Sequence, residues 1–393
     1  MTALPVPPPL AIYLHFPWCV SKCPYCDFNS YTLHDALPET RYLEALDADL
    51  AAQRPGLQGR TVHSVFMGGG TPSLFSPAAI AGVIDRLRTG FSLAADAEIT
   101  LEANPGTIER GRFAEYRAAG VNRVSLGAQT FDAATLKVLG RIHSAGDIEV
   151  AAGELHAAGL DNFNLDLMFA LPGQSRAAAL ADLQAALALG PAHLSHYQLT
   201  LEPGTPYAAR PPPRLPDDDL AWDMQRDCHE LLAARGYAHY EISGFARPGR
   251  HCVHNLNYWQ FGDYLGAGAG AHGKLSWVGR AAIERSTQLR EPRRYQAAPV
   301  TGLVRRDVAE RDLPFEFALN ALRLIDGFDL SLFTTRTGLG ADCILPQLHA
   351  LAARELVNVA GQRWRATELG LRFLNDVLEA FLPAPISQVG TEA

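Results

Sequence analysis

The chain has 393 residues, of which 48% are hydrophobic and 19% charged, and its formal net charge is −8. This composition is typical of a globular protein with one large domain and a smaller one. The acidic balance argues against nucleic-acid binding, and the absence of a long apolar run argues against a transmembrane segment. Peripheral membrane contact stays open. The proline-rich N-terminus lacks the features of a signal peptide, so we expect a cytoplasmic protein.

Short β-branched runs alternate with amphipathic stretches over the first two hundred residues. Leu43, Leu46 and Leu50 recur at helical spacing in one such stretch. The alternation predicts an α/β fold with parallel strands and crossover helices. The expected strands are Leu10–Phe16, Val62–Met67, Ala97–Glu102, Asn122–Leu126, Phe163–Met168 and Leu194–Leu199. Periodicity alone leaves a complete barrel, a partial barrel and an open sheet as alternatives.

Polar and glycine-rich segments follow these strands where each one ends. Cys19 lies just after the first strand, Gly68-Gly-Gly-Thr-Pro follows the second, and Glu102 ends the third. Gln129 follows the fourth strand, and Asp166 lies in the fifth. Ligands of α/β folds bind at this edge of the sheet. We therefore expect one site that collects side chains from most of the domain.

The remaining chain divides into a connector and a small terminal domain. Pro203–Pro216 is proline-rich and ends the repeat pattern; a helix is expected over Asp217–Arg235 and a loop-rich stretch over Arg280–Arg311. From Leu313 onward, helices followed by a short hairpin predict a winged-helix-like α+β domain. The expected domains are 1–202, 203–312 and 313–393.

Many winged helices bind DNA, which is the alternative for this last domain. Residues 311–383 carry seven basic and nine acidic side chains. A net negative charge opposes binding to phosphate, so we favour a structural role and expect no nucleic-acid partner.

Three of the six cysteines form a C-x3-C-x2-C motif, Cys19, Cys23 and Cys26. Clustered cysteines in a reducing compartment indicate a metal rather than disulfides. Three thiolates can each take one iron of a cubane cluster, whereas structural zinc prefers four protein ligands and no second CxxC is present. We predict a [4Fe-4S] cluster with one open iron, which can chelate the amine and carboxylate of an amino acid.

This spacing, with Tyr25 just before the last cysteine, resembles the signature of the radical S-adenosylmethionine superfamily. More narrowly, the chain resembles the oxygen-independent coproporphyrinogen oxidase group from about Leu10 to Leu382. The segments that carry this resemblance are Tyr13-Leu-His-Phe-Pro-Trp-Cys19, Gly68-Gly-Gly-Thr-Pro-Ser73, Glu102-Ala-Asn-Pro-Gly, Gly127-Ala-Gln129-Thr, Gly140-Arg141 and Asn164-Leu-Asp166-Leu. The resemblance implies a partial (β/α)6 barrel and bound S-adenosylmethionine.

The resemblance also implies which residues contact that cofactor: Tyr13, Gly69, Gly70, Thr71, Glu102, Gln129, Arg141, Asp166 and Gln198. S-adenosylmethionine carries an ammonium, a sulfonium and ribose hydroxyls, and Glu102, Gln129 and Asp166 offer acceptors for them. Arg141 could pair with its carboxylate or with an acidic neighbour. The alternative for each residue is an ordinary hydrogen bond or ion pair at a strand end.

Two departures separate the chain from the decarboxylating enzymes of the group. Those enzymes extend the motif to C-x3-C-x2-C-x-C, whereas Phe28 stands at the fourth position here, and only eighteen residues precede Cys19. The haem-chaperone branch of the group shares both departures. The segment from His251 to Trp259 resembles a motif of that branch associated with haem binding.

Candidate haem contacts in and after this segment are His251, Cys252, His254 and His272. Imidazole and thiolate are the usual axial ligands of haem iron. The alternatives are hydrogen bonds to backbone and, for His272, a place near the adenosyl group. The resulting hypothesis is a haem chaperone that transfers haem to acceptor proteins and receives electrons from a donor. The rivals are a coproporphyrinogen III oxidase and a radical enzyme with another substrate.

Overall fold

The computed structural model describes residues 6–57, 59–106 and 111–383. Within them, six parallel strands form the centre of one large sheet: β1 (Leu10–Phe16), β4 (Thr61–Gly69), β5 (Ser92–Ala103), β6 (Arg123–Gln129), β7 (Phe163–Phe169) and β8 (His193–Gln198). Each coincides with a predicted strand to within a few residues. The α/β prediction for this half of the chain is confirmed.

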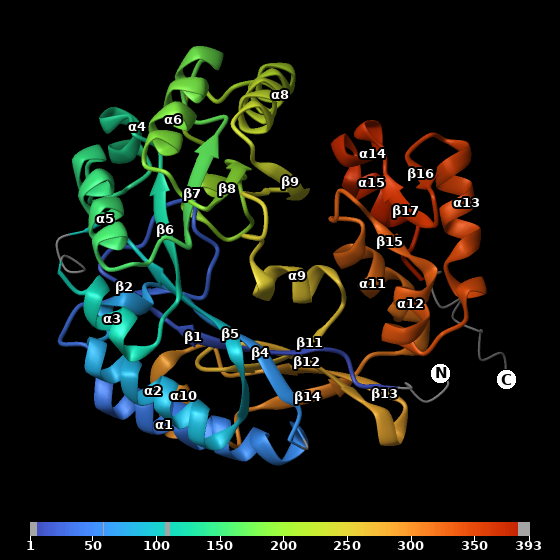
Figure 1. Ribbon diagram of the computed structural model, residues 1–393, viewed down its shortest axis with the longest axis horizontal. Coiled ribbons are helices and arrows are strands. Elements are labelled where there is room, and N and C mark those ends of the chain that lie inside the picture. Colours follow the sequence, from blue (N-terminus) through green and yellow to red (C-terminus); the bar gives the residue numbers. More distant parts are fainter. Residues whose placement is uncertain (1–5, 58, 107–110, 384–393) are drawn as a thin grey trace, which may run out of the picture.

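The crossover helices cover the outer side of the curved sheet (Figure 1). They are α1 (Glu39–Gln53), α2 (Pro77–Gly90), α3 (Phe113–Ala119), α4 (Ala133–Val138), α5 (Ala145–Ala157) and α6 (Arg176–Ala188). Leu43, Leu46 and Leu50 of α1 are buried as their spacing predicts. Ser76 and Ser144 cap α2 and α5 by accepting from backbone amides, which fixes where these helices begin.

Further strands extend the sheet at both edges. At one edge β11 (Asp263–Ala267) pairs parallel to β1, followed by antiparallel β12 (His272–Trp277), β13 (Ala282–Thr287) and β14 (Val304–Asp307). At the other edge, β10 (Gly244–Ala246) and β9 (Ala238–Glu241) pair antiparallel beyond β8. The two edge strands, β14 and β9, do not pair with each other among the described residues. The fold is a partial barrel.

The prediction of a loop-rich stretch over 280–311 was only partly right. This stretch contains β13, the helix α10 (Pro292–Ala297) and β14. All four residues of β14 are exposed, so its sequence lacks the apolar alternation of a half-buried strand. The edge forms because the backbone of β13 pairs with β12 and that of β14 pairs with β13. Backbone pairing does not require a particular pattern of side chains.

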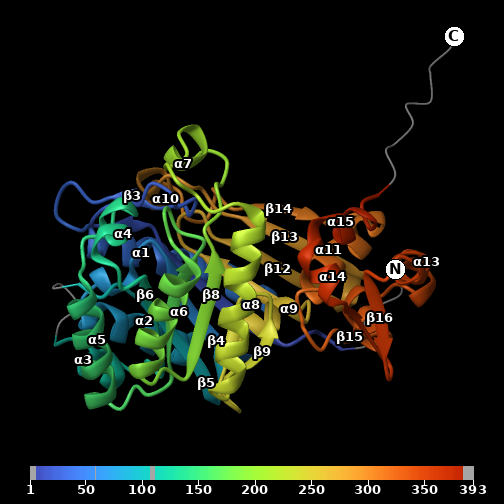
Figure 2. The same cartoon turned by 90° about the horizontal axis from the view of Figure 1, so that it is seen from above.

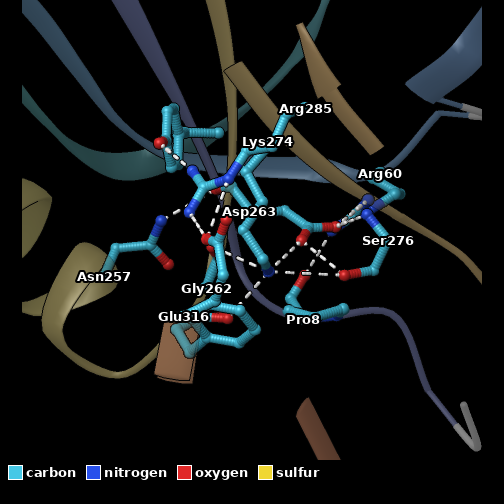
Figure 3. A network of polar contacts seen from close by, with 11 residues as sticks. Pro8, Arg60, Asn257, Gly262, Asp263, Lys274, Ser276, Arg285 and Glu316 are labelled. Carbon is cyan, nitrogen blue, oxygen red and sulfur yellow. Dashed lines mark hydrogen bonds and ion pairs between the residues drawn. The ribbon is translucent and has the colours of Figure 1, made fainter. Parts of the chain in front are cut away.

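A buried polar network joins the sheet extension to the central strands and to the C-terminal helices (Figure 3). Asp263 of β11 pairs with Lys274 of β12 at 3.0 Å and with Arg60 at 2.8 Å. Arg285 of β13 pairs with Glu316 of α11 (Leu313–Ala321). Burial lowers the pKa of Lys274 to about 8, and the Asp263 carboxylate opposes that shift. The mutual pairing of these charges offsets the cost of burying them.

After α11, the chain forms β15 (Phe328–Asp329), α12 (Leu330–Thr337), α13 (Leu345–Ala353), a hairpin of β16 (Val357–Ala360) and β17 (Arg363–Ala366), then α14 (Glu368–Arg372) and α15 (Leu374–Glu379). The three strands form a separate sheet in the order β15-β17-β16. This arrangement confirms the winged-helix-like prediction, with β16 and β17 as the wing.

The C-terminal core continues into the sheet extension. Phe317 and Phe333 of this core pack with two residues of the extension. Phe261 directly precedes β11, and Ile283 lies in β13. Figure 2 shows the C-terminal elements beside α8 (Asp218–Ala234) and β9. The domain boundaries at 202 and 312 stay predictions. None of the described helices is long and apolar enough to cross a membrane.

Candidate cofactor site

A cavity of about 630 Å³ opens at the carboxyl ends of the parallel strands. Its walls come from the loop after β1, the ends of β4 to β8, and the chain that follows β6. The predicted residues that line it are Cys19, Cys23, Cys26, Gly69, Gly70, Thr71, Glu102, Gln129, Arg141, Asp166 and Gln198. Residues from distant parts of the sequence therefore meet at one edge of the sheet, as the topology requires.

The cysteine loop is held on several sides. Cys19 ends the short strand β2 (Trp18–Cys19), which pairs with β3 (Tyr31–Thr32), and the amide of Cys26 donates to the carbonyl of Cys23 at 3.2 Å. Lys22 closes the loop by donating to the carbonyls of Phe28 and Ser30, both at 3.0 Å. The protein's own hydrogen bonds therefore help to hold the shape of this loop.

The three thiols line the same cavity but do not converge on one point. Among the described residues, no three histidine, cysteine or acidic side chains lie close enough to hold a single metal ion. A cubane cluster does not need that convergence, because each thiolate takes a different iron. Burial raises the pKa of Cys19 and Cys26, so metal binding at these thiols is coupled to the release of protons.

Two glycines allow the loops to pack against one another. Gly69 has φ +113°, and a Cβ there would lie 2.4 Å from the ring of His15. Gly140 has φ +71°, and a Cβ there would lie 2.9 Å from Cδ of Pro24, inside the cysteine loop. Only glycine fits these positions without displacing the neighbour. The second contact brings the next residue, Arg141, to 3.6 Å from Sγ of Cys23.

Two carboxyl groups line the same cavity. Glu102 accepts from the amide of Gly69 at 2.9 Å, and burial, followed by the charge of Asp166, raises its pKa to about 8. Asp166 accepts from Asn164 at 2.8 Å, and burial raises its pKa as well. A cation in this cavity would favour the ionised form of both groups. The site therefore suits a positively charged ligand such as an ammonium or a sulfonium.

Gln129 adopts a left-handed backbone conformation at φ 70°, which is uncommon for a residue with a side chain. It lies at an irregularity in the pairing of β6 with β7, and its Oε1 accepts from the hydroxyl of Tyr197 at 2.7 Å. Such a conformation is retained only where neighbouring contacts determine it, and these positions concentrate at ligand sites.

Sequence reasoning missed Asn104 and Tyr197, which also line the cavity. Asn104 accepts from Arg141 at 2.5 Å and donates to Thr71 at 2.9 Å, so it joins two of the predicted contacts. Its position two residues after Glu102, at the same strand end, was the available signal. Tyr197 directly precedes Gln198, and this adjacency was the only feature of the sequence that pointed to it.

Five predicted residues lie outside the cavity: Tyr13, His251, Cys252, His254 and His272. The ring of His251 lies 4.5 Å from that of Tyr240. Tyr13 lies in β1, with its hydroxyl 3.0 Å from Nδ1 of His15. His254 is 1% exposed, and its ring nitrogens lie 3.1 Å from Oγ of Ser64 and 3.2 Å from the hydroxyl of Tyr258. His272 is exposed on β12.

The segment around His254 forms the helix α9 (Val253–Trp259). Glu98 of β5 accepts from the amides of Val253 and His254, which satisfies the first turn of this helix. The thiol of Cys252 also donates to Glu98, at 3.5 Å, and burial raises its pKa to about 12. Among the motif residues it is Trp259 that lines the cavity.

Comparisons with known proteins agree with this geometry. Residues 13–185 match the Radical SAM superfamily, and residues 308–373 match the HemN C-terminal domain. The structure resembles that of coproporphyrinogen III oxidase (HemN) from Escherichia coli, with a TM-score of 0.79 and 25% identity, covering 95% of this chain and 90% of that one. The fold and the cysteine-lined cavity thus define a radical S-adenosylmethionine protein.

The curated relatives narrow this class. Heme chaperone HemW of Escherichia coli is 49% identical over 376 residues, covering 95% of this chain and 98% of the relative. Heme chaperone HemW of Haemophilus influenzae is 44% identical over 383 residues, covering 96% and 99%. The chain belongs to the HemW family. Membership of the radical S-adenosylmethionine superfamily implies a [4Fe-4S] cluster and S-adenosylmethionine as its cofactors.

Proposed function

We propose that the protein is a haem chaperone, which binds haem and transfers it to acceptor proteins. The observation that carries this proposal is the identity of 49% with Heme chaperone HemW of Escherichia coli over nearly the full length of both chains. The proposal includes haem-acceptor proteins and an electron donor as partners, a cytoplasmic location, and no nucleic acid.

Cys19, Cys23 and Cys26 would each take one iron of the cluster. The contacts to S-adenosylmethionine would come from Gly69, Gly70, Thr71, Glu102, Gln129, Arg141, Asp166 and Gln198, with Tyr13 behind them in β1. When bound, the two cofactors supply one-electron chemistry. The chain itself provides carboxylates for the cationic groups, and it places a guanidinium 3.6 Å from one cluster thiol.

The rival function is oxidative decarboxylation of coproporphyrinogen III, which the likeness to HemN supports at the level of the fold. Phe28 argues against it. Its side chain is 56% exposed and lines the cavity at the position where the decarboxylating enzymes carry a fourth cysteine. The chaperone function is therefore the better supported of the two.

One comparison tests the two functions. The protein is purified without oxygen, its cluster is reconstituted, and haem and coproporphyrinogen III are offered in parallel. We expect stoichiometric haem binding, transfer of haem to an apo-acceptor, and no protoporphyrinogen. Formation of protoporphyrinogen together with 5′-deoxyadenosine would contradict the proposal.

The predictions that His251, Cys252, His254 and His272 contact haem stay predictions. Among them, His272 has an exposed imidazole, whereas axial ligation by His254 would require the loss of its contacts to Ser64 and Tyr258. Replacement of each residue by alanine, with the haem spectrum as the measurement, distinguishes among them.

A further inference from the structure

A second cavity, of about 980 Å³, lies between the last strands of the large sheet and the C-terminal domain. One wall is α8, and the opposite wall is formed by the wing strands and α14 (Figure 1). We call it the interdomain cavity. Its volume lies at the upper end of the range for sites that enclose a small molecule of drug or cofactor size.

Stacked rings form the base of the interdomain cavity. His196 stacks on Phe169 with centroids 4.7 Å apart, and both residues line the cavity. His239 also lines it and stacks at 4.3 Å on Phe245, which lies behind the wall. His229 of α8 lies 4.8 Å from both His239 and Phe245. A wall of flat, weakly polar rings is suited to a planar apolar ligand.

Two imidazole nitrogens in this wall have no hydrogen-bond partner within the described part of the chain. They are Nδ1 of His196, a side chain only 2% exposed, and Nε2 of His229. A buried polar atom without a partner costs free energy, which a bond to a ligand in this cavity would recover. Burial lowers the pKa of both residues to about 3, so both imidazoles are neutral at physiological pH. The neutral form is the one that binds metals.

The opposite wall carries two arginines, Arg365 and Arg372, and one carboxyl group, Glu368. Arg365 of β17 donates to the amide oxygen of Asn358 at 3.2 Å, and no carboxylate pairs with it among the described residues. Arg226, by contrast, is paired with Asp223 at 2.9 Å. The uncompensated guanidinium of Arg365 is therefore available to a carboxylate on a ligand.

The interdomain cavity adjoins the cofactor cavity. Tyr197, Gln198, Thr200, Ser243 and Arg323 line both of them. Arg323 lies over the ring of Trp259 at 4.3 Å, so the tryptophan of the haem-associated motif marks the junction. A ligand in the interdomain cavity would lie next to the cluster and S-adenosylmethionine without displacing them.

We propose that the interdomain cavity is the haem site of this protein. The macrocycle would pack on the stacked rings, the imidazole of His229 would bind the iron, and Arg365 would pair with a propionate. This inference rests on the proposed haem-chaperone function and names where that function is carried out. It also assigns a task to the wing, which binds a carboxylate of haem rather than a phosphate of DNA.

Two variants test the assignment. Each is compared on haem and on a haem analogue that lacks either the propionate charges or the iron. Arg365→Gln should weaken haem binding about tenfold and leave haem dimethyl ester unaffected, because the ester has no propionate charge. His229→Phe keeps the ring packing; it should weaken haem binding about tenfold and shift the Soret band. Iron-free protoporphyrin IX should bind this variant as it binds the wild type.

Arg354→Gln and His349→Ala are the controls, because both side chains are exposed in the same domain and lie outside the cavity. Circular dichroism and iron–sulfur absorbance check that each variant is folded. If both test variants kept the haem affinity and spectrum of the wild type, the assignment would be overturned and the chaperone function would stand. Loss of haem in His254→Ala alone would place the haem site at the motif instead. If the wild-type protein bound no haem, the proposed function would fail first. Should His229→Phe not fold, the ester comparison with Arg365→Gln decides.

Discussion

The cofactor cavity and the interdomain cavity are built from opposite chemistry. The first presents thiols and two carboxyls, Glu102 and Asp166, from strand ends of a single sheet. The second presents neutral imidazoles, aromatic rings and Arg365, which pairs with no carboxylate of the described residues, from elements on either side of a domain junction. A carboxyl-lined cavity favours a cation, and a cavity with aromatic walls and a guanidinium favours a planar anion. Adjacent cavities of one protein can therefore hold two ligands without competition.

The largest expected effect concerns the cluster. Replacement of Cys19, Cys23 or Cys26 by alanine should reduce the iron and sulfide content and the visible iron–sulfur absorbance to background, because each thiolate holds a different iron. Cys343→Ser is the matched control, since Cys343 lies in the C-terminal domain. A cluster retained in all three variants would refute the assignment.

Asp166→Asn should weaken the binding of S-adenosylmethionine by about 10- to 100-fold, which is the range for the loss of a charge-assisted hydrogen bond. Haem affinity should stay unchanged, because Asp166 does not line the interdomain cavity. Anaerobic equilibrium dialysis measures the first ligand and absorbance titration the second. Asp161→Asn, an exposed carboxylate of the same domain, controls for net charge. If Asp166→Asn weakened the binding of both ligands equally, the two ligands would share one site rather than occupy two cavities.

His254→Ala should lower the free energy of unfolding by about 2 to 4 kcal/mol, because it opens space in the core and leaves Ser64 and Tyr258 without a shared partner. Haem affinity, measured where the variant is folded, should not change. Denaturant unfolding and haem titration provide the two readings. A loss of haem affinity at unchanged stability would instead support the motif as the haem site.

The pH dependence of stability should have opposite sign in the two cavities. The raised pKa of Glu102, about 8 against the ordinary 4.5, means that the folded state holds its proton more tightly than the unfolded state. Its contribution is full below pH 4.5 and is lost as pH rises toward 8. The lowered pKa of His229, about 3 against 6.5, means that its contribution is full above pH 6.5 and is lost as pH falls toward 3.

Each slope is limited to about 1.4 kcal/mol per pH unit. Unfolding of the cofactor-free protein across this range, compared with Glu102→Gln and with His229→Phe, isolates the two contributions. Glu102→Gln should remove the fall in the free energy of unfolding that Glu102 causes as pH rises. His229→Phe should remove the fall that His229 causes as pH drops. Identical pH profiles for wild type and variant would show that the group is not buried as described.

The cofactor cavity could be predicted from the sequence because parallel strands place their carboxyl ends at one edge. Residues as far apart as Cys19 and Gln198 therefore had to meet once the alternation of strands and helices was recognised. The helix α9 obeys no such rule, because the face that a helix presents depends on what packs against it. Glu98 and Ser64 orient this helix so that His254 is enclosed and Trp259 reaches the cavity.

The sequence by itself determined the positions of the core strands, the cysteine loop, the polar residues at the strand ends and the winged-helix-like domain, since each leaves a local pattern of period, spacing or turn. Only the tertiary structure decided the edge strands β13 and β14 and the interdomain cavity. The edge strands form by backbone pairing, which does not constrain side chains. The cavity joins His229 to Arg365, two residues whose proximity depends on how one domain packs on the other.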